Sequence, residues 1–229
     1  MKKLTSFLLI ICLTLSCTAA FAAGKLTVQQ ETYVPMPFLD SFAGYVFAEV
    51  ENTGDKNIEF GSGIYEILNA DGDPVESDDV YSCYPEILAP GEFGYVYLYE
   101  TVDDAEKIED VSDYTLTLSG KSTKEDVTTR LTAEATYGEV ENGWGGTDYA
   151  VIITLKNDTD ATLYDVAGSY GLYDADGKLL YASAITTYNV GLPAGQTMEL
   201  KETISSDFVE LWDKNGTAPA TVKTIGFQN

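Results

Sequence analysis

Histidine is absent from this 229-residue sequence, and arginine occurs once, as Arg130. Nucleophilic sites of the Ser-His-Asp and Cys-His types require an imidazole, as do HExxH metalloenzymes and zinc sites with histidine ligands. The sequence also lacks a GxxxxGK(S/T) phosphate-binding loop, and one arginine cannot supply the clamps of a phosphoryl-transfer enzyme. These absences exclude the commonest catalytic designs. They predict a protein that is not an enzyme and holds no cofactor.

Cysteine is also scarce. Cys12 and Cys17 lie in the first 22 residues, which leaves Cys83 without a partner for an internal disulfide. No base or cation that would lower the pKa of its thiol stands beside Cys83, so we expect a small buried hydrophobic side chain. Without disulfides the chain depends on an apolar core, and 45% hydrophobic residues with 16 tyrosines and nine phenylalanines can build one.

The first 22 residues have the pattern of a secretory signal peptide. Two lysines precede an apolar run over residues 4–15, and the segment ends on the small-x-small sequence Ala20-Phe21-Ala22. The run is short for a membrane span, and no stop-transfer pattern follows it. We therefore expect a mature chain from about residue 23, secreted or otherwise extracytoplasmic.

A lipoprotein signal is the alternative interpretation of this segment. Cys17 follows an apolar run and would become the acylated first residue of a lipid-anchored protein. However, Thr14 stands where such a signal usually carries leucine, and Leu15 stands where it prefers a small residue. The sequence therefore favours simple export.

Acidic residues outnumber basic ones by 37 to 13, which gives a net charge of −24. Loss of Lys2 and Lys3 with the signal peptide takes the charge to −26. Binding to nucleic acid depends on lysine and arginine that displace counterions, so this charge excludes nucleic acid as a partner. It also disfavours an anionic membrane surface. It is compatible with a soluble exported protein or with cation binding.

The chain contains two copies of one unit. Asn52 recurs as Asn157 at a separation of 105 residues, and Leu88 recurs as Leu192 at 104. Further matches at these two separations are Lys25-Leu26-Thr27 with Arg130-Leu131-Thr132, Asp55 with Asp160, Tyr65 with Tyr170, Ala70-Asp71-Gly72 with Ala175-Asp176-Gly177, Tyr84 with Tyr188, and Gly91 with Gly195. The repeat predicts two domains, residues 23–122 and 127–229, joined by a polar segment.

Each unit has the pattern of β-strands. Val46, Ala48 and Val50 alternate with larger or polar residues, and residues 151, 153 and 155 are apolar at the matching positions. About seven such short segments per hundred residues favour a β-sandwich. Residues 207–212 and their counterpart at 103–110 have apolar spacings typical of one helical turn, which would place Trp212 as a lid over the core.

The acidic stretch Asp174-Ala175-Asp176-Gly177 is predicted to be a turn. An EF-hand loop needs oxygen ligands at positions 1, 3 and 5, glycine at 6 and glutamate at 12. From Asp174, position 5 is Lys178; in the first copy Pro74 replaces the glycine and Val80 stands at position 12. Asp-Gly between alternating apolar runs instead favours a hairpin, because glycine readily adopts positive φ.

These residues resemble a known family. Residues 170–174, YGLYD, followed by Asp-Gly-Lys at 176–178 and Leu-Pro-Ala-Gly at 192–195, are similar to the FxLYD domain, a bacterial extracytoplasmic module with an immunoglobulin-like β-sandwich fold. Tyr170 replaces the phenylalanine, and the first copy departs further, with YEILN at 65–69 and LAPG at 88–91. The resemblance covers about half of each unit and implies no catalytic residue or ligand. The predicted fold class is all-β: two tandem immunoglobulin-like β-sandwich domains, each with one short helical turn.

One cluster of acidic side chains has the residue types needed for hydrolysis or for calcium binding. Asp73, Glu76, Asp78 and Asp79 lie together in the first copy, whereas residues 180–184 of the second copy contain no acid. A pair of carboxylates suffices for glycoside hydrolysis, and the same groups could hold calcium at a loop end. A chain with 37 acidic residues also clusters some of them by chance.

Exposed aromatic residues are the stronger indication of function. Phe38 and Phe42 lie in the same loop of the first copy as Trp144 does in the second. Such loop tips can stack on sugars or anchor in a pocket of a partner, or they can fill the interface between the domains. Tyr45 and Phe47, on the outward face of their strand, extend this candidate patch unless another segment covers them.

The sequence therefore predicts an exported, non-enzymatic binding or interaction module of the bacterial cell envelope or secretome. Its partner would be a protein or a glycan whose identity the sequence does not indicate. One alternative is a passive spacer or assembly subunit. The other is a carboxylate-based glycoside hydrolase.

Overall fold

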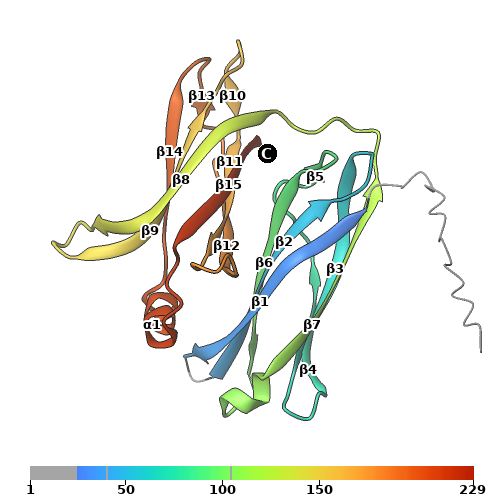
Figure 1. Cartoon of the computed structure of the whole chain (residues 1–229), viewed down its shortest axis with the longest axis vertical. Coiled ribbons are helices and arrows are strands. Elements are labelled where there is room, and N and C mark those ends of the chain that lie inside the picture. Colours follow the sequence, from blue (N-terminus) through green and yellow to red (C-terminus); the bar gives the residue numbers. More distant parts are fainter. Residues whose placement is uncertain (1–24, 40, 104) are drawn as a thin grey trace, which may run out of the picture.

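The computed structural model describes residues 25–39, 41–103 and 105–229. The predicted signal peptide and Cys17 lie outside these residues. The described chain is all-β, with strands arranged in two sandwiches that pack side by side (Figure 1). The predicted fold class is therefore confirmed.

Two antiparallel sheets form the first sandwich. One sheet has the order β1-β2-β6, and in the other β3 lies between β4 and β7 and also pairs with the short β5. A short 3₁₀ helix, η1, precedes β7. The elements are β1 (Leu26–Phe38), β2 (Ser41–Asn52), β3 (Ile58–Leu68), β4 (Pro74–Val80), β5 (Ile87–Leu88), β6 (Phe93–Val102), η1 (Ile108–Val111) and β7 (Asp113–Ser122).

The second sandwich repeats this arrangement. Its strands follow the order β12-β11-β15-β8-β9-β14, because β8 pairs with β15 at its start and with β9 along the rest of its length. Two short strands, β10 and β13, pair separately. The elements are β8 (Arg130–Glu141), β9 (Thr147–Lys156), β10 (Leu163–Tyr164), β11 (Val166–Tyr173), β12 (Leu179–Thr186), β13 (Gly191–Leu192), β14 (Thr197–Thr203), α1 (Ser206–Asn215) and β15 (Thr221–Gln228).

Alternating apolar side chains fill each sandwich. Val46, Ala48 and Val50 of β2 are completely buried, as are Val151, Ile153 and Leu155 of β9. Tyr65 and Ile67 of β3 and their counterparts Tyr170 and Leu172 of β11 are buried from the opposite sheet. A strand places every second side chain on the same face, so this period of two determines which face of each sheet becomes core.

The Asp-Gly stretches form hairpin turns, as predicted. Gly177 has φ of +80°, and the Asp174 carboxylate accepts hydrogen bonds from the backbone N–H groups of Asp176 and Lys178, both at 2.9 Å. In the first sandwich the Asn69 side chain accepts bonds in the same way between β3 and β4. These side-chain oxygens stabilise the backbone of the turns.

Helical segments occur near both predicted positions. In α1 the Ser205 side chain caps the first turn, Gly216 ends the helix with φ of +66°, and Phe208 and Trp212 face inward. Trp212 packs into the core of the second sandwich, as expected of a lid. Its counterpart η1 is a single turn that buries Val111. Among the described residues, no helix is long and apolar enough to span a membrane.

The two sandwiches share a buried junction. The outward face of the β1-β2-β6 sheet packs against β11 and β12, and apolar residues of both sandwiches form one continuous cluster. Polar contacts border this junction: the Gln30 side chain accepts a bond from Leu179 N–H at 2.9 Å, and Arg130 makes a two-point ion pair with Glu92 at 2.8 and 3.1 Å. The sandwiches therefore form one rigid unit.

Candidate functional site

The junction covers two of the aromatic residues that the sequence indicated. Phe47 is 3% exposed and packs on Tyr181 and Phe208, with ring centroids 4.7 and 5.8 Å away. Tyr45 is half-buried, with its ring stacked on Tyr99 at 5.4 Å and in a T-shaped contact with Phe208 at 5.2 Å. The second sandwich, and not a loop, covers these outward-facing side chains of β2. Phe47 is therefore not presented to solvent as a ligand-binding residue.

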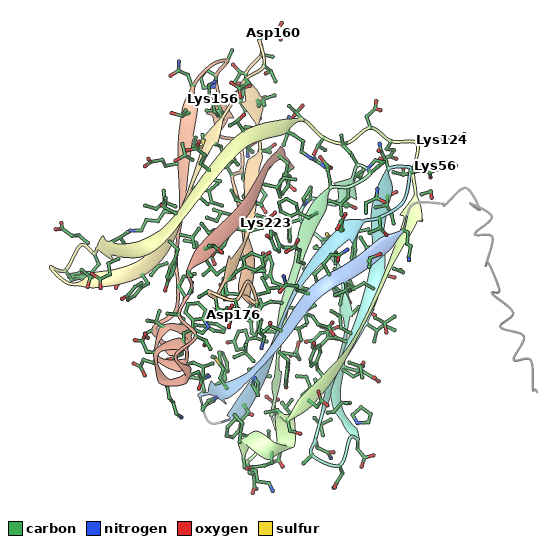
Figure 2. All side chains as sticks on the ribbon, in the orientation of Figure 1. Lys56, Lys124, Lys156, Asp160, Asp176 and Lys223 are labelled. Atoms are coloured by element: carbon green, nitrogen blue, oxygen red, sulfur yellow. The ribbon has the colours of Figure 1, made fainter. Side chains whose placement is uncertain are left out.

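A charged network lies beside these aromatic rings. The buried Glu49 carboxylate forms an ion pair with Lys223, which is labelled in Figure 2, and accepts a hydrogen bond from the hydroxyl of Tyr173; both partners belong to the second sandwich. The Tyr95 and Tyr173 hydroxyl oxygens are 2.9 Å apart, and the Lys223 ammonium lies 3.7 Å from the centre of the Phe93 ring. The partners of Glu49 compensate its charge, so the network holds the sandwiches together and is not a free ligand site.

Phe38 and Phe42 lie at the end of β1 and the start of β2. The Phe38 ring is 6.4 Å from that of Tyr99, and both phenylalanines are partly buried. Phe42 also lines a groove of about 910 Å³ between this hairpin, the segment before η1, and α1. Neither ring projects freely into solvent.

Trp144 is fully presented to solvent. It stands at the turn between β8 and β9, where its side chain is 97% exposed. The Asn142 side chain holds this turn: its oxygen accepts bonds from the backbone N–H groups of Trp144 at 3.1 Å and Gly146 at 2.9 Å, and its amide donates to Asp148 at 3.0 Å. The structure thus combines an ordered turn with an unpacked indole.

The aromatic residues at the two hairpin ends do not form one surface. The β8–β9 end and the β1–β2 end lie on different sides of α1 (Figure 1). Phe42 and Trp144 belong to equivalent hairpins of the two sandwiches, β1–β2 and β8–β9, as the sequence predicted. The ends of these hairpins are separate in space.

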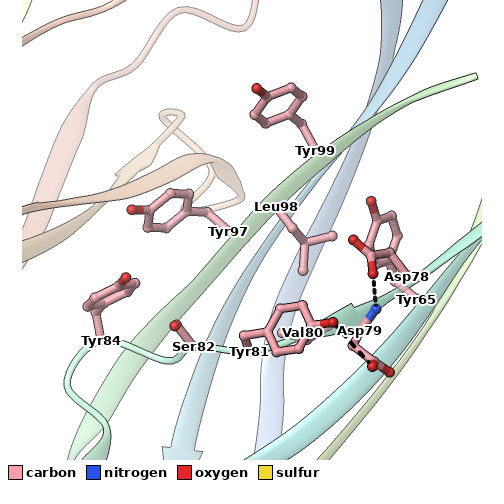
Figure 3. Close-up of a pocket in the computed structure, with 10 residues that line it drawn as sticks. All are labelled: Tyr65, Asp78, Asp79, Val80, Tyr81, Ser82, Tyr84, Tyr97, Leu98 and Tyr99. Atoms are coloured by element: carbon pink, nitrogen blue, oxygen red, sulfur yellow. Dashed lines mark hydrogen bonds between the residues drawn. The ribbon is translucent and has the colours of Figure 1, made fainter.

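A recess lined by tyrosines lies on the first sandwich (Figure 3). We call it the tyrosine recess, and its volume is about 300 Å³. It is bordered by β6, by β4 and by the segment that follows β4. The lining residues are Tyr65, Asp78, Asp79, Val80, Tyr81, Ser82, Tyr84, Tyr97, Leu98 and Tyr99.

No sequence pattern predicted this recess. Alternation along residues 94–100 of β6, GYVYLYE, places Tyr97 and Tyr99 on one face of the strand. The position of Tyr81 on the opposite wall depends on how the segment after β4 returns toward β6. No local pattern in the sequence specifies that path.

The acidic cluster considered for hydrolysis or calcium lies partly in this recess. Asp78 and Asp79 are exposed on the edge strand β4, where the Asp78 carboxylate accepts a bond from the Asp79 N–H at 2.7 Å. The Tyr81 hydroxyl donates to Asp79 at 3.3 Å, and Asp79 is the main cause of a raised Tyr81 pKa. The described residues contain no group of three or more acidic or cysteine side chains that could hold a metal ion.

Cys83 stands in the chain between Ser82 and Tyr84, which line the recess, and is 2% exposed. Burial raises the pKa of its thiol to about 12, so the thiol stays protonated at neutral pH. The expectation of a small buried hydrophobic side chain agrees with this position.

No protein-family model matches this sequence, and no curated protein matches it closely enough to establish a relationship. The similarity to the FxLYD domain therefore stays a prediction based on the residues quoted above.

Proposed function

We propose that this chain is an exported, non-enzymatic binding module of the bacterial cell envelope or secretome, and that it engages a glycan or a protein through Trp144. The observation that carries this proposal is the 97% exposed indole on a turn fixed by the Asn142 side chain. Because hydrogen bonds already order the backbone of the turn, binding of a partner to the ring would cost little backbone conformational entropy.

The size of the indole makes it an effective anchor. A tryptophan side chain offers roughly 150–250 Å² for burial. At about 25 cal/mol per Å², covering it contributes on the order of 4–6 kcal/mol before the costs of association. An aromatic face suits both stacking on a sugar ring and insertion into a protein pocket. The other exposed residues of the turn, three glycines, leave the ring accessible from both faces.

A passive spacer is the second candidate, and the junction between the sandwiches favours it. An uninterrupted apolar cluster and the Glu49–Lys223 ion pair fix the relative position of the two bodies. A body in which the two domains hold a fixed relative position is what a spacer requires. It is equally suitable as a platform for a displayed residue, and the exposure of Trp144 supports the binding module over the spacer.

Binding of the mature chain to glycans tests the proposal. Residues 23–229 would be screened by thermal shift and titration against digested bacterial cell wall and a set of host glycans, with calcium as a separate arm. We expect a ligand whose affinity falls at least about tenfold in Trp144→Ala, since removal of the indole removes more than 1.4 kcal/mol of contact.

A matched variant controls for loss of an exposed aromatic ring in general. Tyr188, 72% exposed in the second sandwich, would be changed to alanine in parallel and should leave the affinity unchanged. A ligand that binds Trp144→Ala as tightly as the unmodified chain would contradict a role for the indole. Absence of binding to every cell-wall fragment and host glycan in the screen would favour the spacer.

A further inference from the structure

The tyrosine recess has a lining suited to a specific class of ligand. Tyr81 and Tyr99 stand at its mouth, 75% and 57% exposed, while Tyr84 and Tyr97 stack on each other with ring centroids 5.7 Å apart. Figure 3 shows these rings on two sides of the recess, with Asp78 and Asp79 at one end. A volume of about 300 Å³ lies at the lower end of the range for small-molecule sites.

Negative charge in the recess is not compensated by any cation of the described chain, since none of the lining residues is a lysine or an arginine. The ion pairs of the described chain involve Lys121, Arg130, Lys156 and Lys223, and none of them includes Asp78 or Asp79. Local partners only partly satisfy the two carboxylates, since their bonds come from one backbone N–H and one tyrosine hydroxyl.

The surroundings of the Tyr65 hydroxyl show the electrostatic character of the recess. Tyr65 lines the recess and is 1% exposed, with the carboxylate of Glu100 beside its hydroxyl. Burial raises the pKa of Tyr65, and the nearby carboxylates of Glu100, Asp78 and Glu76 raise it further, which shows the sign of the local potential.

We propose that the tyrosine recess binds an organic cation, a guanidinium or alkylammonium group, between the faces of its tyrosines and the carboxylates of Asp78 and Asp79. Cations are attracted to the faces of aromatic rings, and the attraction is strengthened where water is excluded. Carboxylates add charge-assisted hydrogen bonds to N–H donors. The net charge of −24 also raises the local concentration of cations at the mouth of the recess.

A neutral sugar is less complementary to the charge of this lining than an organic cation is. It could stack on Tyr81 or Tyr99 and donate hydroxyl hydrogens to the carboxylates, but it would leave two negative charges uncompensated. A metal ion is a poorer fit, because the described residues provide no cluster of three suitable ligands. The recess and Trp144 lie on different sandwiches, so this site is independent of the proposed function of the indole.

The test uses ligands that differ only in charge. The mature chain would be titrated with L-argininamide and with L-citrullinamide, its neutral analogue, while amide and tyrosine ring signals are followed by NMR. We expect millimolar association of the guanidinium compound, shifts confined to the residues that line the recess, weaker binding at high salt, and no saturation with the neutral analogue. A tripeptide Gly-Arg-Gly and its citrulline counterpart distinguish a peptide side chain from a free small amine.

Two sets of variants locate the site. We expect the double variant Asp78→Asn/Asp79→Asn and, separately, Tyr99→Leu to weaken binding of argininamide at least about fivefold. Asp160→Asn, at the far end of the second sandwich (Figure 2), and Tyr164→Leu, which removes a 55% exposed ring, are the matched controls and should bind normally. Circular dichroism and thermal melting establish that each variant is folded.

Equal binding of the charged and neutral ligands would overturn the proposal, and so would unchanged affinity in the folded Asp78→Asn/Asp79→Asn variant. Shifts spread over acidic residues of both sandwiches would also overturn it, because they would indicate attraction to net charge alone. Trp144→Ala should leave argininamide binding intact, so failure of the Trp144 proposal and failure of the cation proposal are separate outcomes.

Discussion

Asn157 makes in the second sandwich the same two side-chain hydrogen bonds that Asn52 makes in the first. Asn52 donates to the carbonyls of Lys56 and Leu88 at 2.8 and 2.9 Å, and Asn157 donates to those of Ala161 and Leu192, both at 2.8 Å. Both asparagines are fully buried. Each amide ties the end of a strand to the loop that follows it and to a short strand, β5 or β13, so the sequence repeat is also a repeat of internal contacts.

Replacement of either asparagine by alanine should destabilise the protein to a similar extent. Each substitution leaves two carbonyls without their side-chain donor in a buried site, which costs about 2–4 kcal/mol in the free energy of unfolding. Urea denaturation of Asn52→Ala and Asn157→Ala measures this directly. Asn229→Ala, at the exposed C-terminus, is the control. A loss below about 0.5 kcal/mol in either buried variant would show that the shared geometry contributes little.

Removal of the Tyr173 hydroxyl should weaken the junction between the sandwiches. Tyr173→Phe keeps the buried ring but leaves the Glu49 carboxylate with one donor fewer, and we expect a loss of about 1.5–3 kcal/mol, the range for hydrogen bonds to charged groups. Chemical denaturation followed by circular dichroism gives the value. Tyr188→Phe, at an exposed position, should change stability by less than about 0.5 kcal/mol.

The two sandwiches should unfold together in the same denaturation experiment. Because one apolar cluster spans both bodies, the unmodified chain should unfold in a single transition. Two separate transitions in the unmodified chain would contradict the rigid junction.

Stability should fall steeply in alkaline solution. Burial raises the pKa values of Tyr95, Tyr170 and Tyr173 above their usual value near 10. Above pH 10 the unfolded chain loses these protons while the folded chain keeps them, so folded stability is complete below pH 10 and decreases as the pH rises. Each tyrosine contributes a slope of up to about 1.4 kcal/mol per pH unit.

Urea titrations at pH 8, 10 and 11 measure this slope. Tyr173→Phe should reduce the slope by the contribution of about one tyrosine. A stability that is constant from pH 8 to pH 11 would mean that the buried hydroxyls ionise as easily in the folded chain as in the unfolded one.

Features that depend on local patterns could be predicted from the sequence. Alternation at Val46, Ala48 and Val50 specified the core face of β2, and the Asp-Gly stretch at 176–177 specified the turn between β11 and β12. Comparison of the two copies reinforced each assignment, because the same pattern appeared twice. Export and the FxLYD resemblance stay predictions.

Contacts between distant segments could not be predicted in the same way. The outward position of Phe47 was correct, but its burial depends on Tyr181 and Phe208, more than 130 residues along the chain. The tyrosine recess likewise needs the path of residues 81–84 past β6. An exposed aromatic face has the same sequence signature whether a ligand or a second domain covers it.

Acrylamide quenching of the Trp144 fluorescence tests most directly whether a partner binds the displayed indole. The chain has two tryptophans, Trp144 at 97% exposure and Trp212 at 3%, so acrylamide should quench mainly the Trp144 emission. In Trp144→Phe most of this accessible component should disappear. Saturation with the glycan or cell-wall fragment selected in the binding screen should protect the accessible component in the unmodified chain. Saturated binding that leaves Trp144 as readily quenched as in the free protein would contradict binding through the indole.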